Sequence, residues 1–162
     1  MKIAITTDHT GFEAIRELSL FLESIGHECV YFGPQSFELD DDYPDLIFPA
    51  AKAVADKSCD VGIIMGGSGQ GEAMAANRIK GVRSAVFYGP VLAKVAVDAE
   101  GNMSDDPYEI IKLSRTHNNA NVLSLSARFL TMEEMKQASK LWLETPTTDV
   151  ERHLRRIQKL DV

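Results

Sequence analysis

The sequence predicts an α/β fold of three layers, in which a five-stranded parallel sheet lies between helices on both faces. Short apolar runs alternate five times with longer segments of helical spacing, which is typical of βαβ units. The chain of 162 residues has the length of one domain. No internal repeat or low-complexity linker divides it, so we expect residues 1–162 to form a single domain.

The first strand is expected at residues 2–6 and the first helix at residues 12–25. The strand is a short apolar run, and the helix places its apolar residues on one face. Gly26 follows at the position where a glycine commonly closes a helix. A second strand is expected at residues 28–32.

A polar loop and a second helix come next. The loop contains three adjacent acids at residues 40–42, which indicate solvent exposure, or a metal site that lacks further ligands. The helix begins at Tyr43, with Pro44 near its first position, and continues to residue 57. Pro49 inside it predicts a kink or a late helix start.

The third strand, residues 61–65, leads through a glycine-rich turn at residues 66–72 into an Ala-rich helix that extends to about residue 80. Thr131 and Glu134 predict a capping box at the start of a later helix, which ends at Thr145. The other expected elements are a strand at 83–87, a helix at 91–99, a turn-rich segment at 100–107, a helix at 108–116, a strand at 121–125 and a last helix at 148–160.

Composition excludes several classes of partner. The net charge of −7 argues against binding to nucleic acid. No apolar run approaches the roughly 20 residues that span a membrane, and the N-terminus begins a strand rather than a signal peptide, so we expect a cytoplasmic protein. Cys29 and Cys59 lack CxxC spacing and are expected to be buried free thiols.

The turn at residues 66–72 has the features of an anion site. Its glycines allow the main chain to lie against a ligand, because no Cβ blocks the approach. The amides of the turn and the free N–H groups at the start of the next helix attract negative charge. Glu72 places a carboxylate at the mouth of this pocket, where it is either a helix-start residue or a catalytic base.

Two nucleotide-binding patterns do not fit this turn. A dinucleotide-binding pattern that starts at Gly67 meets Glu72 where its third glycine belongs. A P-loop finds its spacing at Gly66 and Gly71, but Glu72 replaces its lysine. A small anion pocket beside a carboxylate suits a developing enolate or enediolate better than a pyrophosphate.

Other polar residues are expected at the same edge of the sheet. Asp8 and His9 directly follow the first strand and Arg128 follows the fifth, and ligands of open parallel sheets bind at that edge. Asp8 could equally be a helix N-cap, and His9 a surface residue. His117 and Asn118 precede the fifth strand, so only a neighbour or a long loop could bring them close.

The last turn of the chain is basic. Such a cluster is either a solvated face or a small anion site, and charge alone favours the solvated face. The residues are Arg152, His153, Arg155, Arg156 and Lys159.

Several motifs, in the same order along nearly the whole chain, resemble the ribose-5-phosphate isomerase B and galactose-6-phosphate isomerase family. The resemblance implies a Rossmann-like (flavodoxin-like) fold, homodimers or dimers of dimers, and interconversion of aldose and ketose phosphates without a metal or an organic cofactor. Ribose 5-phosphate is the expected substrate; allose or galactose 6-phosphate, or sugar-phosphate binding without catalysis, are the alternatives. The matching motifs include Asp8-His9-x-Gly11, Asp42-Tyr43-Pro44, the turn from Gly66 to Glu72, Arg115-Thr116-His117-Asn118 and Arg152-His153-x-Arg155-Arg156.

The resemblance also assigns catalytic roles. One branch of the family has a catalytic cysteine at the position of Gly66, and the other has a glutamate just after the turn. This chain matches the second branch, with Glu72 as the base. Ser68 would move a proton between the two reacting oxygens. The enediolate would be stabilised by main-chain amides of the turn, including those of Gly67, Gly69 and Gly71.

The remaining implied roles concern the sugar and its phosphate. Ring opening would fall to Asp8 or His117, and Tyr43 and Asn118 would contact hydroxyl groups. The C-terminal arginines would reach the active site of the neighbouring subunit, with the helix at residues 148–160 exchanged. The phosphate would be held by His9, Arg128, Arg152 and Arg156.

Two departures from the family bear on substrate choice. The segment at residues 97–106 looks longer than the corresponding region of the family, and Thr10 replaces the more usual alanine.

Overall fold

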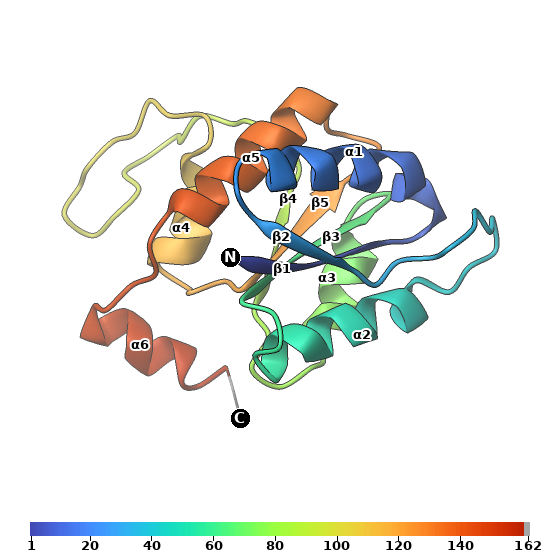
Figure 1. The fold of residues 1–162 in the computed structure, drawn as a ribbon. Helices are drawn as coiled ribbons and strands as arrows, with labels where there is room; N and C mark the ends of the chain where they lie inside the picture. The colour runs from blue at the N-terminus through green and yellow to red at the C-terminus, as the bar shows by residue number, and fades with distance from the viewer. Residues whose placement is uncertain (161–162) are drawn as a thin grey trace.

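Five parallel strands form one sheet in the order β2-β1-β3-β5-β4 in the computed structural model, which describes residues 1–160 (Figure 1). The expected α/β architecture is confirmed. The last two strands exchange places relative to the flavodoxin order 2-1-3-4-5. The strands are β1 (Lys2–Thr7), β2 (Glu28–Tyr31), β3 (Val61–Gly66), β4 (Ser84–Phe87) and β5 (Val122–Ser126).

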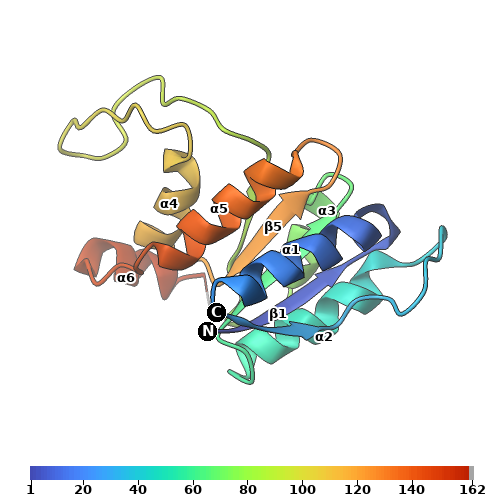
Figure 2. The same ribbon diagram turned by 45° about the horizontal axis from the view of Figure 1, so that its top comes forward.

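Helices cover both faces of the sheet. Helices α1 (Phe12–Ser24) and α5 (Met132–Glu144) pack side by side on one face, and α4 (Glu109–Thr116) lies beside α5 (Figures 1 and 2). Helices α2 (Tyr43–Ala55) and α3 (Gln70–Ala76) cover the other face. Helix α6 (Glu151–Ile157) lies beyond the sheet near the end of α4.

Successive side chains of β1 point to opposite faces of the sheet and belong to two hydrophobic cores. Ile3 and Ile5 join the cluster under α1 and α5, which contains the fully buried Trp142. Ala4 joins the cluster under α2, which contains Ile47. The central strands are therefore buried on both faces, as parallel sheets usually are. Among residues 1–160, no helix is both long and apolar enough to cross a membrane.

Several local expectations are confirmed. Gly26 follows α1 with a φ of 92°, and Thr131 and Glu134 form the expected capping box of α5. Cys29 and Cys59 are free thiols, although Cys29 is only partly buried. Helix α2 starts at Tyr43 and passes through Pro49, so the late helix start is wrong. Pro49 is exposed, so water can reach the carbonyl that its missing N–H leaves unpaired.

The helix expected at residues 91–99 is absent from the structure, and this prediction is wrong. The segment follows β4 as irregular chain, with Val91, Leu92 and Val95 exposed to between 49% and 73%. A short helix in water needs an apolar face to bury, and β-branched residues add little intrinsic helix propensity. Helix α3 also ends at Ala76, before the expected residue 80.

Candidate active site

Three neighbouring strands deliver the predicted site residues to one edge of the sheet. Strand β3 ends at Gly66 and continues into the glycine turn, and it lies between β1 and β5. Asp8 and His9 follow β1 directly, and Arg128 follows β5 two residues after that strand ends. The expected grouping of these residues at the carboxyl edge of the sheet is confirmed.

Two buried serines of β5 hold the glycine turn. Ser126 Oγ donates a hydrogen bond of 2.9 Å to Gly67 O, and Ser124 Oγ donates one of 2.6 Å to Gly69 O. Because a trans peptide points its C=O and N–H in opposite directions, the N–H groups of the next residues face away from β5. Gly69 has a φ of 74°, and a Cβ there would lie 2.9 Å from Leu125 O.

These serines were missed in the sequence. The signal was present, because Ser124 and Ser126 alternate with apolar residues along a buried strand and so share one face. A hydroxyl on a fully buried strand needs a hydrogen-bond partner, and the adjacent turn is a natural one.

Glu72 lies in the first turn of α3 with its carboxylate packed over Gly66. The residue is 4% exposed, and a Cβ at position 66 would lie 2.0 Å from Glu72 Cδ. Burial raises the pKa of Glu72, its own backbone N–H opposes that rise, and the charge of Asp8 adds to it. The effect of burial on this pKa therefore outweighs that of the N–H group at the start of α3.

Asp8 is buried and caps the short turn that follows β1. Its Oδ1 accepts hydrogen bonds from Thr10 N at 2.9 Å and from Thr10 Oγ1. The alternative interpretation of Asp8 as an N-cap is therefore confirmed. This capping bond also fixes a carboxylate close enough to influence the charge of Glu72.

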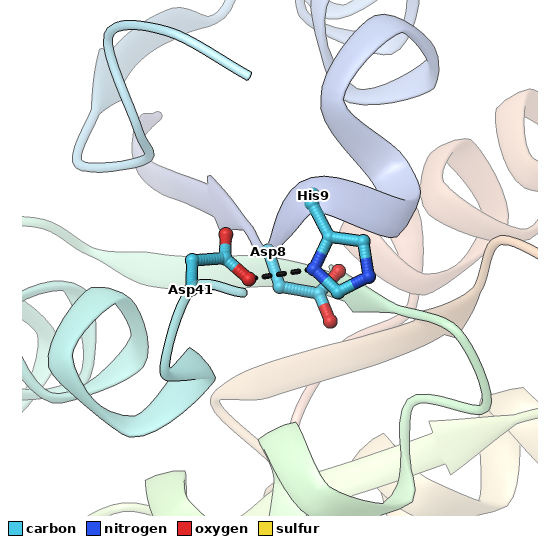
Figure 3. Close-up of side chains that lie close together, drawn as sticks. All are labelled: Asp8, His9 and Asp41. Carbon is cyan, nitrogen blue, oxygen red and sulfur yellow. Dashed lines mark hydrogen bonds and ion pairs between the residues drawn. The ribbon is translucent and has the colours of Figure 1, made fainter. Parts of the chain in front are cut away.

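His9 forms an ion pair with Asp41, although the three adjacent acids of its loop predict solvent exposure. The distance from His9 Nδ1 to Asp41 Oδ1 is 2.6 Å (Figure 3). The Asp41 side chain is 10% exposed, whereas its neighbours Asp40 and Asp42 are exposed as expected. The acidic loop is thus partly buried, because it folds over the end of β1, and no local pattern in the sequence shows that contact.

Asp8, His9 and Asp41 place their ligand atoms within 4.8 Å of one another. Hydrogen bonds within the chain already occupy His9 Nδ1 and Asp8 Oδ1. We therefore assign no metal ion to this group.

Tyr43 and Arg128 flank the turn, in places that glycines leave open. A Cβ on Gly71 would lie 2.9 Å from Tyr43 Cζ, and a Cβ on Gly67 would lie 3.2 Å from Arg128 Nε. Ser68 is exposed on the turn itself, and its Oγ accepts a hydrogen bond of 3.3 Å from Gln70 N, at the start of α3. The edge therefore combines a buried carboxylate, main-chain donors, a hydroxyl and cationic groups.

Two of the other predicted residues, His117 and Arg152, gather in a second cluster around His153, whereas Asn118 lines a different pocket. His117 and Asn118 precede β5, so about 13 Å of strand separates them from the glycine turn. The His117 ring lies 4.5 Å from the ring of His153, and Arg152 Nε donates a 3.0 Å hydrogen bond to His153 Nε2. Burial, followed by the charges of His153 and Arg152, lowers the pKa of His117.

A cavity of about 460 Å³ lies at this second cluster, and the long segment at residues 97–106 forms part of its wall. Glu100 of that segment forms an ion pair of 3.6 Å with Arg152. Arg156 is exposed on the same short helix. Within the described chain, the structure therefore does not bring His117, Asn118, Arg152 and Arg156 to Glu72.

Comparisons with known proteins identify relatives along nearly the whole chain. The chain matches the family model described as Ribose/Galactose Isomerase over residues 3–103 and 106–160, with the interruption inside the long segment. It is 34% identical over 161 residues to ribose-5-phosphate isomerase B of Mycolicibacterium paratuberculosis, covering 99% of this chain and 89% of that protein.

Solved structures are also similar along nearly the whole chain. Ribose-5-phosphate isomerase B of Clostridium thermocellum superposes with a TM-score of 0.84 at 32% identity, covering 99% of this chain and 95% of that one. The enzyme of Mycoplasma genitalium with bound ribulose-5-phosphate gives a TM-score of 0.83 at 35% identity, covering 99% and 93%.

Proposed function

Because the chain belongs to the ribose/galactose isomerase family, we propose that it interconverts ribose 5-phosphate and ribulose 5-phosphate, with Glu72 as the base. The observation that carries the assignment of Glu72 is its buried carboxylate, which lies over Gly66 beside the main-chain donors of the turn. A protein that only bound sugar phosphates would gain nothing from burying a charge there.

The chemistry follows from the positions of these groups. Glu72 removes the proton from the carbon beside the carbonyl of the open-chain sugar and returns it to the neighbouring carbon. A pKa above the ordinary carboxylate value makes Glu72 a stronger base at neutral pH than an exposed glutamate. In this proposal the main-chain amides of the turn, including those of Gly67, Gly69 and Gly71, stabilise the enediolate formed between the two transfers, and Ser68 moves the proton between its oxygens.

Ring opening needs a group that exchanges a proton with the ring oxygen or the anomeric hydroxyl. Asp8 lies at the edge with Glu72, and His117 has a lowered pKa that keeps its ring neutral and able to accept a proton. Both remain candidates. Tyr43 and Asn118 contact the sugar hydroxyls in this proposal, and His9 and Arg128 contact the phosphate.

The two clusters form one site when two subunits meet. We propose a homodimer, alone or within a dimer of dimers, in which the neighbour supplies His117, Asn118, Arg152 and Arg156. Helix α6 is anchored on its own chain through His153 Nδ1, which donates to Thr116 O at 3.1 Å. Arg152 and Arg156 are one helical turn apart, so both can point at one phosphate.

A panel of aldose phosphates tests the substrate. We expect ribose 5-phosphate to be converted with a kcat/KM at least about tenfold above those of allose 6-phosphate and galactose 6-phosphate, because an extra carbon must fit between fixed phosphate and base positions. Ketose formation is measured for each sugar under the same conditions. Preference for a six-carbon sugar would replace the proposed substrate, and binding without turnover of any sugar would indicate a non-catalytic protein.

Replacing Gly66 with alanine is expected to lower kcat by about 100-fold, because the new methyl group occupies the position of the Glu72 carboxylate and displaces it by an ångström or more. Glu72 can move because it is the end of a flexible side chain, so the fold should persist. Steady-state kinetics and a thermal melt measure both effects.

Gly62→Ala is the matched control on the same strand. Its Cβ would lie 3.2 Å from the side chains of Val54 and Val122, which costs stability without touching Glu72. Full activity of Gly66→Ala would show that the carboxylate does not need its position over Gly66.

A further inference from the structure

The two ring nitrogens of His9 have different environments. Nδ1 donates a hydrogen bond of 2.6 Å to Asp41 Oδ1, and the second nitrogen, Nε2, faces away from Asp41 (Figure 3). The His9 side chain is 22% exposed, so part of the ring is open to a ligand. Because Asp41 takes the Nδ1–H, the proton on Nε2 is the one available for donation.

The loop between β2 and α2 brings Asp41 to this position. The Phe37 ring of that loop makes edge contacts with the rings of His9 and Phe12, at centroid distances of 6.3 and 6.1 Å. Asp41 N donates to Glu38 O at 3.3 Å. Aromatic contacts on one side and a backbone hydrogen bond on the other therefore hold the carboxylate against His9.

The burial of Asp41 is unfavourable for the stability of the fold. Within residues 1–160 its Oδ2 is buried without a hydrogen-bond partner. A buried carboxylate oxygen without a partner costs free energy, and the bond that Asp41 makes through its other oxygen is to a partly exposed histidine. Such groups call for an explanation other than stability.

We propose that Asp41 is a positioning residue of the isomerase, which holds the His9 ring so that its Nε2–H donates to the phosphate of the sugar. The inference rests on the proposed function, in which His9 contacts that phosphate. Asp41 itself touches no substrate and acts through His9.

The charges around His9 favour this role. The hydrogen bond to Asp41 raises the pKa of His9 above 6.5, and the charges of Asp8 and Asp41 add to the rise. Burial and the charge of Arg128 lower it, without cancelling the rise. His9 thus keeps its positive charge to higher pH than a free histidine, and a charged donor binds phosphate more strongly than a neutral one.

The test is Asp41→Asn, which keeps the size of the side chain and removes its charge. We expect KM for ribose 5-phosphate to rise about tenfold at neutral pH, while kcat stays within about twofold, because substrate binding is weakened and the proton transfer is not. The KM of the variant should begin to rise at a lower pH than that of the unaltered protein, because the hydrogen bond that raises the pKa of His9 is lost. The phosphate titrates equally in both proteins, so the difference reports on His9.

Two controls separate positioning from general damage. Asp40→Asn removes an exposed charge from the same loop and should leave KM unchanged. In a His9→Gln background, Asp41→Asn should change KM by less than about twofold, because the two residues act as one unit. NMR titration of the histidine rings without substrate should place the pKa of His9 lower in Asp41→Asn than in the unaltered protein.

The possible failures are distinguishable. An unaltered protein that converts no aldose phosphate overturns the proposed function and this inference with it. An active enzyme in which Asp41→Asn leaves KM unchanged, or raises it equally in the His9→Gln background, overturns only the role of Asp41.

Discussion

Glu72→Gln is expected to lower kcat for isomerisation by about 10³- to 10⁴-fold, because the amide cannot accept the proton that must leave the carbon of the sugar. Ribose 5-phosphate should still bind, since glutamine fills the same space over Gly66 and the phosphate contacts remain. Turnover is followed as ketose formation, and binding by calorimetry. Retained turnover would show that another group is the base.

The stability of this variant serves as its control. A carboxylate whose pKa is raised in the folded state contributes stability only below its unfolded pKa, and loses that contribution as the pH rises through the folded value. At neutral pH the charged Glu72 therefore opposes folding, and Glu72→Gln should melt at or above the temperature of the unaltered protein. A lower melting temperature would mean that lost activity reflects damage to the fold.

Exchange with solvent gives a second measurement. In D₂O the unaltered protein should place deuterium on the reacting carbon of the sugar, because the proton removed by Glu72 can exchange before it returns. Glu72→Gln should incorporate none. Deuterium incorporation without ketose formation would separate proton removal from the later steps.

The parts of the site that follow strand ends were predictable from the sequence. Asp8, His9 and the glycine turn each come directly after an apolar run, and parallel strands bring their ends to one edge. The capping box of α5 was also predictable, because its two partners, Thr131 and Glu134, are only three residues apart in the sequence. Local patterns are sufficient where the interaction is local.

The failures involve contacts between distant segments. Asp41 reaches His9 across 32 residues of chain, and its acidic neighbours gave no sign that one of the three acids is buried. The residues at 91–99 have the length and spacing of a helix, but the structure gives them no core to cover. In both cases the outcome depends on whether the segment is buried by the rest of the chain. Burial is a property of the whole fold, so the local sequence does not show it.

The second cluster is the strongest argument for a shared active site. A sugar phosphate bound at Glu72 needs cationic groups to bind its phosphate. At that edge of the sheet the predicted phosphate contacts are Arg128 and His9. Helix α6, with Arg152 and Arg156, lies at the other end of the sheet in the same chain. The ion pair of Arg152 with Glu100 is partly exposed and hence weak, so it does not prevent Arg152 from binding a phosphate.

Heterodimers test whether one active site takes Glu72 from one subunit and the arginines from the other. Glu72→Gln alone and the double variant Arg152→Ala/Arg156→Ala alone should each be nearly inactive, the latter by about 10³-fold in kcat/KM because both phosphate contacts from α6 are lost. Co-expression with two affinity tags yields dimers with one subunit of each kind. If each site combines Glu72 of one subunit with the arginines of the other, one of two sites is intact and activity returns to about half.

The matched control reverses this outcome. All three substitutions are placed in one subunit, which is paired with an unaltered partner, so the dimer carries the same set of changes. Shared sites then leave one site without its base and the other without its arginines, and the dimer should be inactive. Sites contained in single chains would give the opposite pair of results, with activity in the control and none in the first heterodimer. The two dimers differ only in which chain carries each change, so the comparison depends on the origin of the arginines and on no property of the single variants.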